Sequence, residues 1–202
     1  MKLYYSSGAC SLSPHIALRE AGVKFELVRV SLQAHKLADG ADYYGVNPKG
    51  QVPVLELDDG QRLTEGPAIV QYIADHAPAS GLAPAAGTME RYRLMEWLNF
   101  ITSELHKGFS PLFDATMPAE AKAKFAAKLK DRLAYVDRQL EGRDYLMGER
   151  FCVADGYLFT VTNWAAHVGV DLSGLEHLGA WRARVAARPA VKEAMQAEGL
   201  AK

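Results

Sequence analysis

The sequence has few cysteines, almost no net charge and no long apolar run, and each scarcity excludes a class of protein. Its 202 residues contain two cysteines, whereas a small disulfide-stabilised scaffold needs several. Lys and Arg number 23 against 24 Asp and Glu, which predicts no attraction to nucleic acid or to an anionic membrane. No run of about 18 apolar residues predicts a membrane-spanning helix. The start, MKLYYSSGAC, lacks the apolar core of a signal peptide, so we expect a cytoplasmic protein.

The two cysteines, Cys10 and Cys152, are not expected to pair. The reducing cytoplasm disfavours a structural disulfide. Each cysteine is therefore either a buried small residue or a reactive thiol.

The first 78 residues predict the order β-α-β, an irregular loop, then β-β-α. The expected elements are strands at 2–5 and 25–31, a hairpin over 51–65, and helices over 11–22 and 66–78. Ser11 or Ser13 is expected to cap the first of these helices, and Gly22 to end it.

The composition changes after the second helix. Residues 78–87, PASGLAPAAG, are typical of a linker, and only helical patterns follow. The expected helices cover 88–113, 118–142, 152–169 and, as two helices separated at Arg188-Pro189, 175–200. The sequence therefore predicts an α/β domain followed by an all-α domain.

Cys10 lies in a small-residue turn just before a predicted helix. Free backbone N–H groups and the positive end of the helix dipole favour a thiolate there. Ser13, three residues later, could donate a hydrogen bond to that thiolate. A cysteine that is merely small and buried fits this spacing equally well.

Two short motifs suit the binding of an extended, zwitterionic ligand. A cis Val52–Pro53 bond would turn the backbone of Val52 outward, although cis bonds are uncommon even before proline. Glu65 and Gly66 stand at a helix start, where a carboxylate or an ammonium group can bind. The alternative is that Thr64 or Glu65 simply caps this helix.

Asn99, Ser103, His106 and Ser110 follow spacings of four, three and four in the long helix over 88–113. This spacing places them in one stripe, with Trp97, Ile101 and Leu105 on the other side. Uncharged polar groups suit the wall of a cleft, and they also fit a solvent-exposed face.

Five segments resemble the bacterial beta class of glutathione transferases, and they span nearly the whole chain. They are YYSSGACSLSPHIALREAG, YGVNPKGQVPVLELDDG, LTEGPAIVQYIAD, WLNFITSELHKGFSPLF and RFCVADGYLF. The resemblance implies a thioredoxin-like glutathione-binding domain over 1–78, a linker over 79–87, and a helical domain over 88–202 that forms a hydrophobic second-substrate site. It also implies glutathione as co-substrate without a metal, a small hydrophobic electrophile and a homodimer.

The resemblance further assigns roles to individual residues. Cys10 would lie beside the sulfur of glutathione, and Val52, before a cis Pro53, would pair with the cysteinyl unit. Glu65 and Gly66 would hold the γ-glutamyl end.

On the long helix, Asn99, Ser103 and His106 would reach toward the ligand. Cys10, Ser103 and His106 are thus the predicted catalytic residues. The reaction expected from them is conjugation of glutathione, with thiol exchange or peroxide reduction through Cys10.

The sequence departs from the family pattern at three positions. His35 stands where a lysine often binds the glycyl carboxylate of glutathione, so His35 would bind that carboxylate as a weaker partner. Gly66 stands where a serine hydroxyl is common, so only its backbone N–H would remain for the ligand. Cys152 replaces the Ser or Thr three residues before Asp155, so it is a weak cap, although Asp155 can still accept from a backbone N–H. We therefore interpret Cys152 as structural.

Two other functions compete with conjugation. A glutaredoxin-like thiol–disulfide oxidoreductase would show disulfide reduction without aryl conjugation. A non-catalytic binder of hydrophobic ligands would bind glutathione without reaction.

Overall fold

The computed structural model describes residues 1–200. Contacts between residues divide the chain into two compact units. The first unit is Met1–Ala83 together with the carboxyl-terminal segment from Arg188, and the second is Pro84–Ala187. The carboxyl-terminal segment therefore packs with the first unit, which differs from the predicted limit of 88–202 for one helical domain.

The first unit contains a five-stranded mixed sheet in the order β3-β2-β1-β4-β5. Strand β1 pairs in parallel with β2 and antiparallel with β4, whose partner β5 closes the predicted hairpin. The strands are β1 (Lys2–Tyr5), β2 (Glu26–Ser31), β3 (Lys36–Leu37), β4 (Val54–Glu56) and β5 (Arg62–Thr64). Leu3 in the central strand lies opposite Leu27 on one side and Leu55 on the other, so apolar side chains line up across the sheet.

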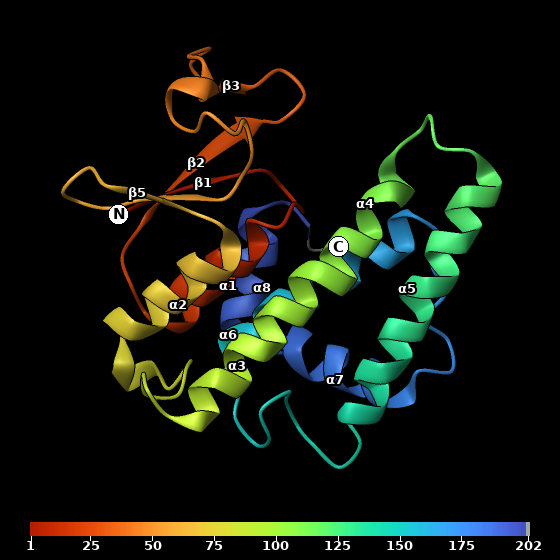
Figure 1. Cartoon of the computed structure of the whole chain (residues 1–202). Helices are drawn as coiled ribbons and strands as arrows, with labels where there is room; N and C mark the ends of the chain where they lie inside the picture. Colours follow the sequence, from red (N-terminus) through yellow and green to blue (C-terminus); the bar gives the residue numbers. More distant parts are fainter. Residues whose placement is uncertain (201–202) are drawn as a thin grey trace. The chain divides into compact units, whose positions relative to one another are not determined.

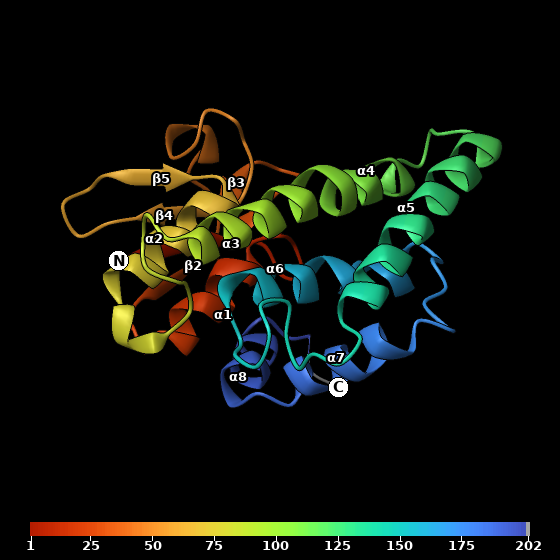
Figure 2. The ribbon, with the colours of Figure 1, turned by 60° about the horizontal axis from the view of Figure 1, so that its bottom comes forward.

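Helices cover the sheet of the first unit. They are α1 (Leu12–Glu20), α2 (Gly66–His76) and α8 (Pro189–Ala197), with short 3₁₀ turns η1 (Tyr43–Gly45) and η2 (Pro78–Ser80). Figures 1 and 2 show α8 beside α1, although the two helices come from opposite ends of the sequence. Fully buried Leu3, Ile16 and Ile69 come from β1, α1 and α2 and form part of the core.

The second unit is helical throughout. Its elements are α3 (Met89–Phe100), η3 (Ile101–His106), α4 (Lys107–Phe113), α5 (Ala119–Gln139), α6 (Val153–Thr162), η4 (Asn163–His167) and α7 (Glu176–Ala186). Figure 2 shows α4 alongside the start of α5, the hairpin that these two helices form. Every residue of α6 is buried, as expected for the central helix of this unit.

The fold class predicted from the sequence is confirmed, with two local differences. The two-residue strand β3 was missed, because so short a run has no periodicity to detect. The long helix over 88–113 is interrupted at η3, which is a π-helix. In the part of the chain that the structure describes, no helix is both long and apolar enough to cross a membrane.

Candidate functional site

Cys10 lies in the turn between β1 and α1, two residues before the helix begins. Its thiol is partly exposed and donates a hydrogen bond to the carbonyl oxygen of Val52, 3.2 Å away. The turn is closed by hydrogen bonds from Ala9 N–H to Ser6 and from Leu12 N–H to Ala9. A partly exposed cysteine just before a helix meets the condition for the predicted reactive thiol, and its reactivity stays a prediction.

The two serines near Cys10 do not act as predicted. Ser11 precedes α1, but its hydroxyl accepts from Ser6 N–H and donates to the carbonyl of Ser6, instead of capping the helix. The backbone of Ser11 is already helical, which turns the side chain away from the free N–H groups. Ser13 is buried and its hydroxyl has no hydrogen-bond partner among residues 1–200, so it does not donate to Cys10.

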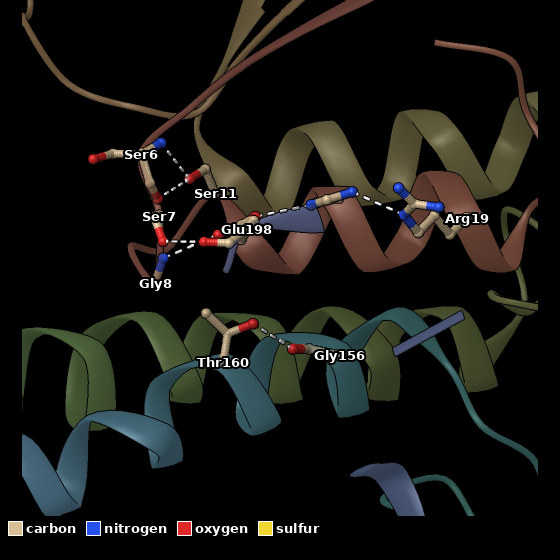
Figure 3. Close-up of polar contacts among 9 residues, drawn as sticks. Ser6, Ser7, Gly8, Ser11, Arg19, Gly156, Thr160 and Glu198 are labelled. Atoms are coloured by element: carbon tan, nitrogen blue, oxygen red, sulfur yellow. Dashed lines mark hydrogen bonds and ion pairs between the residues drawn. The ribbon is translucent and has the colours of Figure 1, made fainter. Parts of the chain in front are cut away.

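Glu198, just past α8, holds the turn that leads to Cys10 (Figure 3). The hydroxyl of Ser7 donates to the carbonyl of Glu198 at 2.5 Å, and Gly8 N–H donates to the Glu198 carboxylate at 2.9 Å. Gly8 has a φ of 71°, a left-handed conformation that favours glycine. Two consecutive residues of the turn are thus fixed by one residue of the carboxyl-terminal segment.

A buried histidine connects that carboxylate to an arginine. Arg19 Nε donates to His15 Nε2 at 2.9 Å, so the hydrogen of the imidazole is on Nδ1 and points at Glu198 Oε1, 2.8 Å away. The side chains of His15 and Glu198 are both 0% exposed. A chain of hydrogen bonds therefore connects the buried carboxyl group of Glu198, through the imidazole of His15, with the guanidinium of Arg19.

The Val52–Pro53 bond is cis, as the resemblance implied, and the segment before it is held by side-chain hydrogen bonds. Asn47 and Tyr43 both donate to the carbonyl of Gln51, at 2.7 and 2.9 Å. Burial raises the pKa of the Tyr43 hydroxyl to about 12, so this group remains a donor throughout the physiological range. These contacts fix the backbone beside Val52.

Glu65 does not cap α2, and neither does Thr64. The backbone of Glu65 has φ 68° and ψ 110°, a strained region for a residue other than glycine. Its side chain pairs instead with Lys49, with 2.6 Å between Nζ and Oε1. Gly66 lies beside Pro53, because a Cβ added to Gly66 would be 4.0 Å from Pro53 Cγ. In the first unit, Cys10 thus contacts Val52, and Gly66 lies close to Pro53.

His35 has a φ of 50°, and its ring stacks on Tyr44 with 4.7 Å between ring centres. Its Nδ1 is buried without a hydrogen-bond partner among the described residues. The predicted contact of His35 with a carboxylate stays a prediction.

The polar residues of the long helix are in the second unit and are exposed or partly exposed. Asn99 and Ser103 face solvent, and the hydroxyl of Ser103 donates to the carbonyl of Asn99 at 3.0 Å. The π-helical segment η3 contains Ser103 and His106, so the regular spacing used to predict the stripe does not hold there. Ile101 and Leu105 are fully buried, as the opposite side of the helix should be.

His106 lies among aromatic residues of the second unit. Its Nδ1 is hydrogen-bonded to the hydroxyl of Tyr157 at 2.6 Å, and its ring lies edge-on to Trp164 with 4.9 Å between centres. Phe109 and Phe113 also contact the edge of Trp164. This arrangement combines one titratable group with an apolar aromatic surface.

Cys152 is buried, and its environment makes it unreactive. Burial raises the pKa of its thiol well above the usual range, as does the neighbouring carboxylate of Asp155. Asp155 Oδ2 accepts from the N–H and the thiol of Cys152, at 2.9 and 3.1 Å. The predicted backbone contact of Asp155 is therefore present. Its Oδ1 accepts from Leu146 N–H and from the indole of Trp181.

Sequence reasoning missed Lys49, Tyr157, Glu198 and His15. Their partners are 16, 51 and 183 residues away in the chain, so no local pattern could have indicated these contacts. Among residues 1–200, no group of three or more His, Cys, Asp or Glu side chains is arranged to hold a metal ion.

Comparison with known proteins gives matches over the whole chain. Residues 1–75 match the family model "Glutathione S-transferase, N-terminal domain", and residues 100–189 match "Glutathione S-transferase, C-terminal domain". The glutathione S-transferase GstA of Escherichia coli O157:H7 is 52% identical over 99% of this chain and 100% of its own length. GST-4.5 of Xanthomonas campestris is 42% identical over the same shares of the two chains.

Solved structures similar to this chain include further glutathione S-transferases. The ternary complex of BphK, described as a bacterial GST, has a TM-score of 0.97 and 59% identity, and the match covers 99% of this chain and all of that one. A sphingomonad glutathione S-transferase complexed with glutathione has a TM-score of 0.95 and 53% identity over both full chains. A beta-class enzyme of Sphingomonas chungbukensis has a TM-score of 0.96 and 50% identity, also over both full chains.

Proposed function

Because the chain belongs to the glutathione S-transferase family, we propose that its site joins the sulfur of glutathione to a hydrophobic electrophile. The protein is a glutathione transferase with glutathione as its co-substrate, like its bacterial relatives. The observation that carries the assignment of the site is the partly exposed thiol of Cys10 at 3.2 Å from the Val52 carbonyl.

Glutathione binds extended along the first unit in this proposal. Its cysteinyl unit pairs with the backbone of Val52 beside Pro53, and its sulfur lies next to Cys10. Its γ-glutamyl end binds at Glu65 and Gly66, and the closeness of the Gly66 backbone to Pro53 supports this placement. Its glycyl carboxylate extends toward His35.

The second unit supplies hydrogen-bond donors and an apolar surface. Asn99, Ser103 and His106 stabilise the sulfur as a thiolate, since charge-assisted hydrogen bonds favour the ionised form. The rings of Trp164 and Phe113 suit a hydrophobic electrophile, because Phe113 remains half exposed beside Trp164. The thiolate attacks the electrophilic carbon, the new carbon–sulfur bond forms, and the leaving group departs with its electron pair.

Thiol exchange through Cys10 is a second activity that the exposure of this thiol favours. The Cys10 thiolate attacks one sulfur of oxidised glutathione and forms a mixed disulfide, and glutathione leaves as a thiolate. Cys152 does not compete, because its burial raises its pKa.

We also propose that the protein is a cytoplasmic homodimer. Glutathione transferases are generally dimeric, and α3 exposes Met89, Tyr92 and Met95. Two free cysteines fit the reducing cytoplasm. Light scattering would measure the oligomeric state, and a monomer at micromolar concentration would contradict the dimer.

The function is tested by two measurements on the wild type, Cys10→Ala and the control Cys152→Ala. The first is glutathione-dependent conjugation of an aryl halide, which we expect in the wild type. The second is intact mass after reaction with oxidised glutathione, where we expect one adduct of glutathione in the wild type and in Cys152→Ala but none in Cys10→Ala. Disulfide reduction without conjugation would identify an oxidoreductase, and binding without either reaction would identify a non-catalytic binder.

A further inference from the structure

We propose that Lys49 is a glutathione-binding residue that, paired with Glu65, recognises the α-amino acid end of the ligand. Glu65 receives the ammonium group, and Lys49 donates to the α-carboxylate. This inference rests on the proposed function and adds a residue to the γ-glutamyl end of that site.

The start of α2 offers little for a carboxylate. Pro67 has no N–H, and the N–H groups of Ala68 and Ile69 both donate to the carbonyl of Glu65 at 3.0 Å. Only the N–H of Gly66 has no acceptor within residues 1–200, and glycine adds no hydroxyl. One neutral backbone donor is a weak partner for a buried or half-buried carboxylate, which needs two or more hydrogen bonds.

Lys49 is positioned to supply the missing donor. Its backbone N–H donates to Asn47 Oδ1 at 3.1 Å, and the next residue, Gly50, donates to the carbonyl of Asn47 at 2.8 Å. The side chain of Asn47 is itself buried and bonded to Gln51, at the residue before Val52. The loop that carries Lys49 is thus fixed to the segment that presents Val52.

The Lys49–Glu65 pair has hydrogen-bonding capacity left for a ligand. Lys49 Nζ donates to Glu65 Oε1 at 2.6 Å and to Thr64 Oγ1 at 3.1 Å, which uses two of its three N–H groups. Glu65 Oε2 has no partner among the described residues. Both side chains are accessible, at 54% and 68% exposed. A free N–H beside a free carboxylate oxygen complements the carboxylate and ammonium of one α-amino acid.

The positive φ of Glu65 supports a binding role for the pair. Glu65 has a φ of 68°, and its side chain makes no cap hydrogen bond to the N–H groups of its own helix. The side chain meets Lys49 instead, and it remains available to a second cation.

The test is the dissociation constant of glutathione, measured calorimetrically on the full-length protein, for the wild type, Lys49→Gln and the control Lys24→Gln. Lys24 is exposed and has no ion pair among the described residues. The substitution Lys24→Gln therefore removes the same charge as Lys49→Gln without breaking an ion pair. We expect Lys49→Gln to weaken binding about fivefold, the scale of an exposed charge-assisted contact, and Lys24→Gln to leave it unchanged.

A second ligand distinguishes the contribution of the α-carboxylate to binding from that of the ammonium group. 4-Aminobutanoyl-Cys-Gly keeps the ammonium of glutathione but lacks its α-carboxylate, so its affinity should be the same in the wild type and in Lys49→Gln. An equal loss for both ligands would mean that Lys49 acts only on Glu65, and this would overturn the proposal. Unchanged binding of glutathione by Lys49→Gln would overturn it as well. Tighter binding would also overturn it, because Lys49 would then compete with the ammonium group of the ligand for Glu65.

Gly66→Ser provides a rescue. The position has an ordinary φ, and a Cβ there has only one neighbour within 4 Å, at 4.0 Å, so the substitution causes no strain. Added to Lys49→Gln, the serine hydroxyl should restore most of the lost affinity. If the double variant bound glutathione as weakly as Lys49→Gln while Gly66→Ser alone bound it normally, Lys49 and residue 66 would not bind the same carboxylate of the ligand. Absence of glutathione binding in the wild type would instead overturn the proposed function itself.

Discussion

The thiol of Cys10 and the carbonyl oxygen of Val52 are joined by a hydrogen bond of 3.2 Å, across 42 positions of the sequence. This contact connects the turn before α1 with the segment before β4. Whatever moves either segment changes the environment of the thiol, so residues far from Cys10 affect its reactivity.

Glu198→Ala should destabilise the protein by about 3 kcal/mol, because it removes the carboxylate of a buried pair and with it the hydrogen bonds from His15 and from Gly8 N–H to that carboxylate. Urea unfolding would measure the change. Glu193→Ala is the matched control, since Glu193 is on the helix that precedes Glu198 and is exposed, and it should change stability by less than about 0.5 kcal/mol. Equal stability of the two variants would show that the buried network contributes nothing.

Cys152→Ser should stabilise the fold by about 1 kcal/mol, because a hydroxyl is a better cap acceptor than a thiol at the start of α6. For a chain of this length, the melting temperature should rise by about 2–4 °C. Cys152→Ala, which has no side-chain acceptor or donor, should lower it. An unchanged or lower melting temperature of the serine variant would count against the cap argument.

Tyr157→Phe should lower the rate of conjugation about tenfold, because the hydroxyl that orients the imidazole of His106 is lost. The KM for glutathione should stay the same, since Tyr157 has no proposed contact with it. Steady-state kinetics would separate the two constants. A raised KM with an unchanged kcat would instead assign Tyr157 to ligand binding.

Glu56→Gln should destabilise the protein at pH 7 and have a smaller effect at acid pH. The pKa of the Glu56 carboxyl is lowered, chiefly by the hydrogen bond that it accepts from Arg62. Glu56 and Arg62 lie opposite each other on the adjacent strands β4 and β5. Because the folded-state pKa lies below the unfolded value, the carboxylate stabilises the fold above the unfolded pKa. This contribution is lost as the pH falls through the folded pKa.

Thermal unfolding of both forms between pH 3 and pH 7 would measure this loss. We expect a difference of about 1 kcal/mol at neutral pH that decreases toward pH 3. If the difference in stability between the wild type and Glu56→Gln grew as the pH fell, the predicted pH dependence would be wrong.

The sequence was sufficient for elements with strong local signals. Strand β1 was predicted at 2–5, where it lies, and the break before Pro189 separates α7 from α8 as expected. The π-helical segment η3 was not predictable, because the apolar residues Ile101 and Leu105 fit a regular helix as well.

The candidate site was predicted in part. Cys10 and Val52 are in contact, and their motifs were recognisable from short spacings. Lys49 and Glu198 were not, because nothing near either residue in the sequence indicates a partner on another element. The assignment of a cap to Ser11 was wrong for a related reason, since a hydroxyl beside a helix start can bind the preceding turn equally well.

The placement of α8 in the first unit determines when the turn before Cys10 can be completed during synthesis. Glu198 leaves the ribosome after the whole second unit, at roughly 5–20 residues per second. Until then, the hydrogen bonds from Ser7, Gly8 and His15 to Glu198 cannot form. A nascent chain therefore keeps its cysteine turn without the Ser7–Glu198 contact until the whole second unit has been translated.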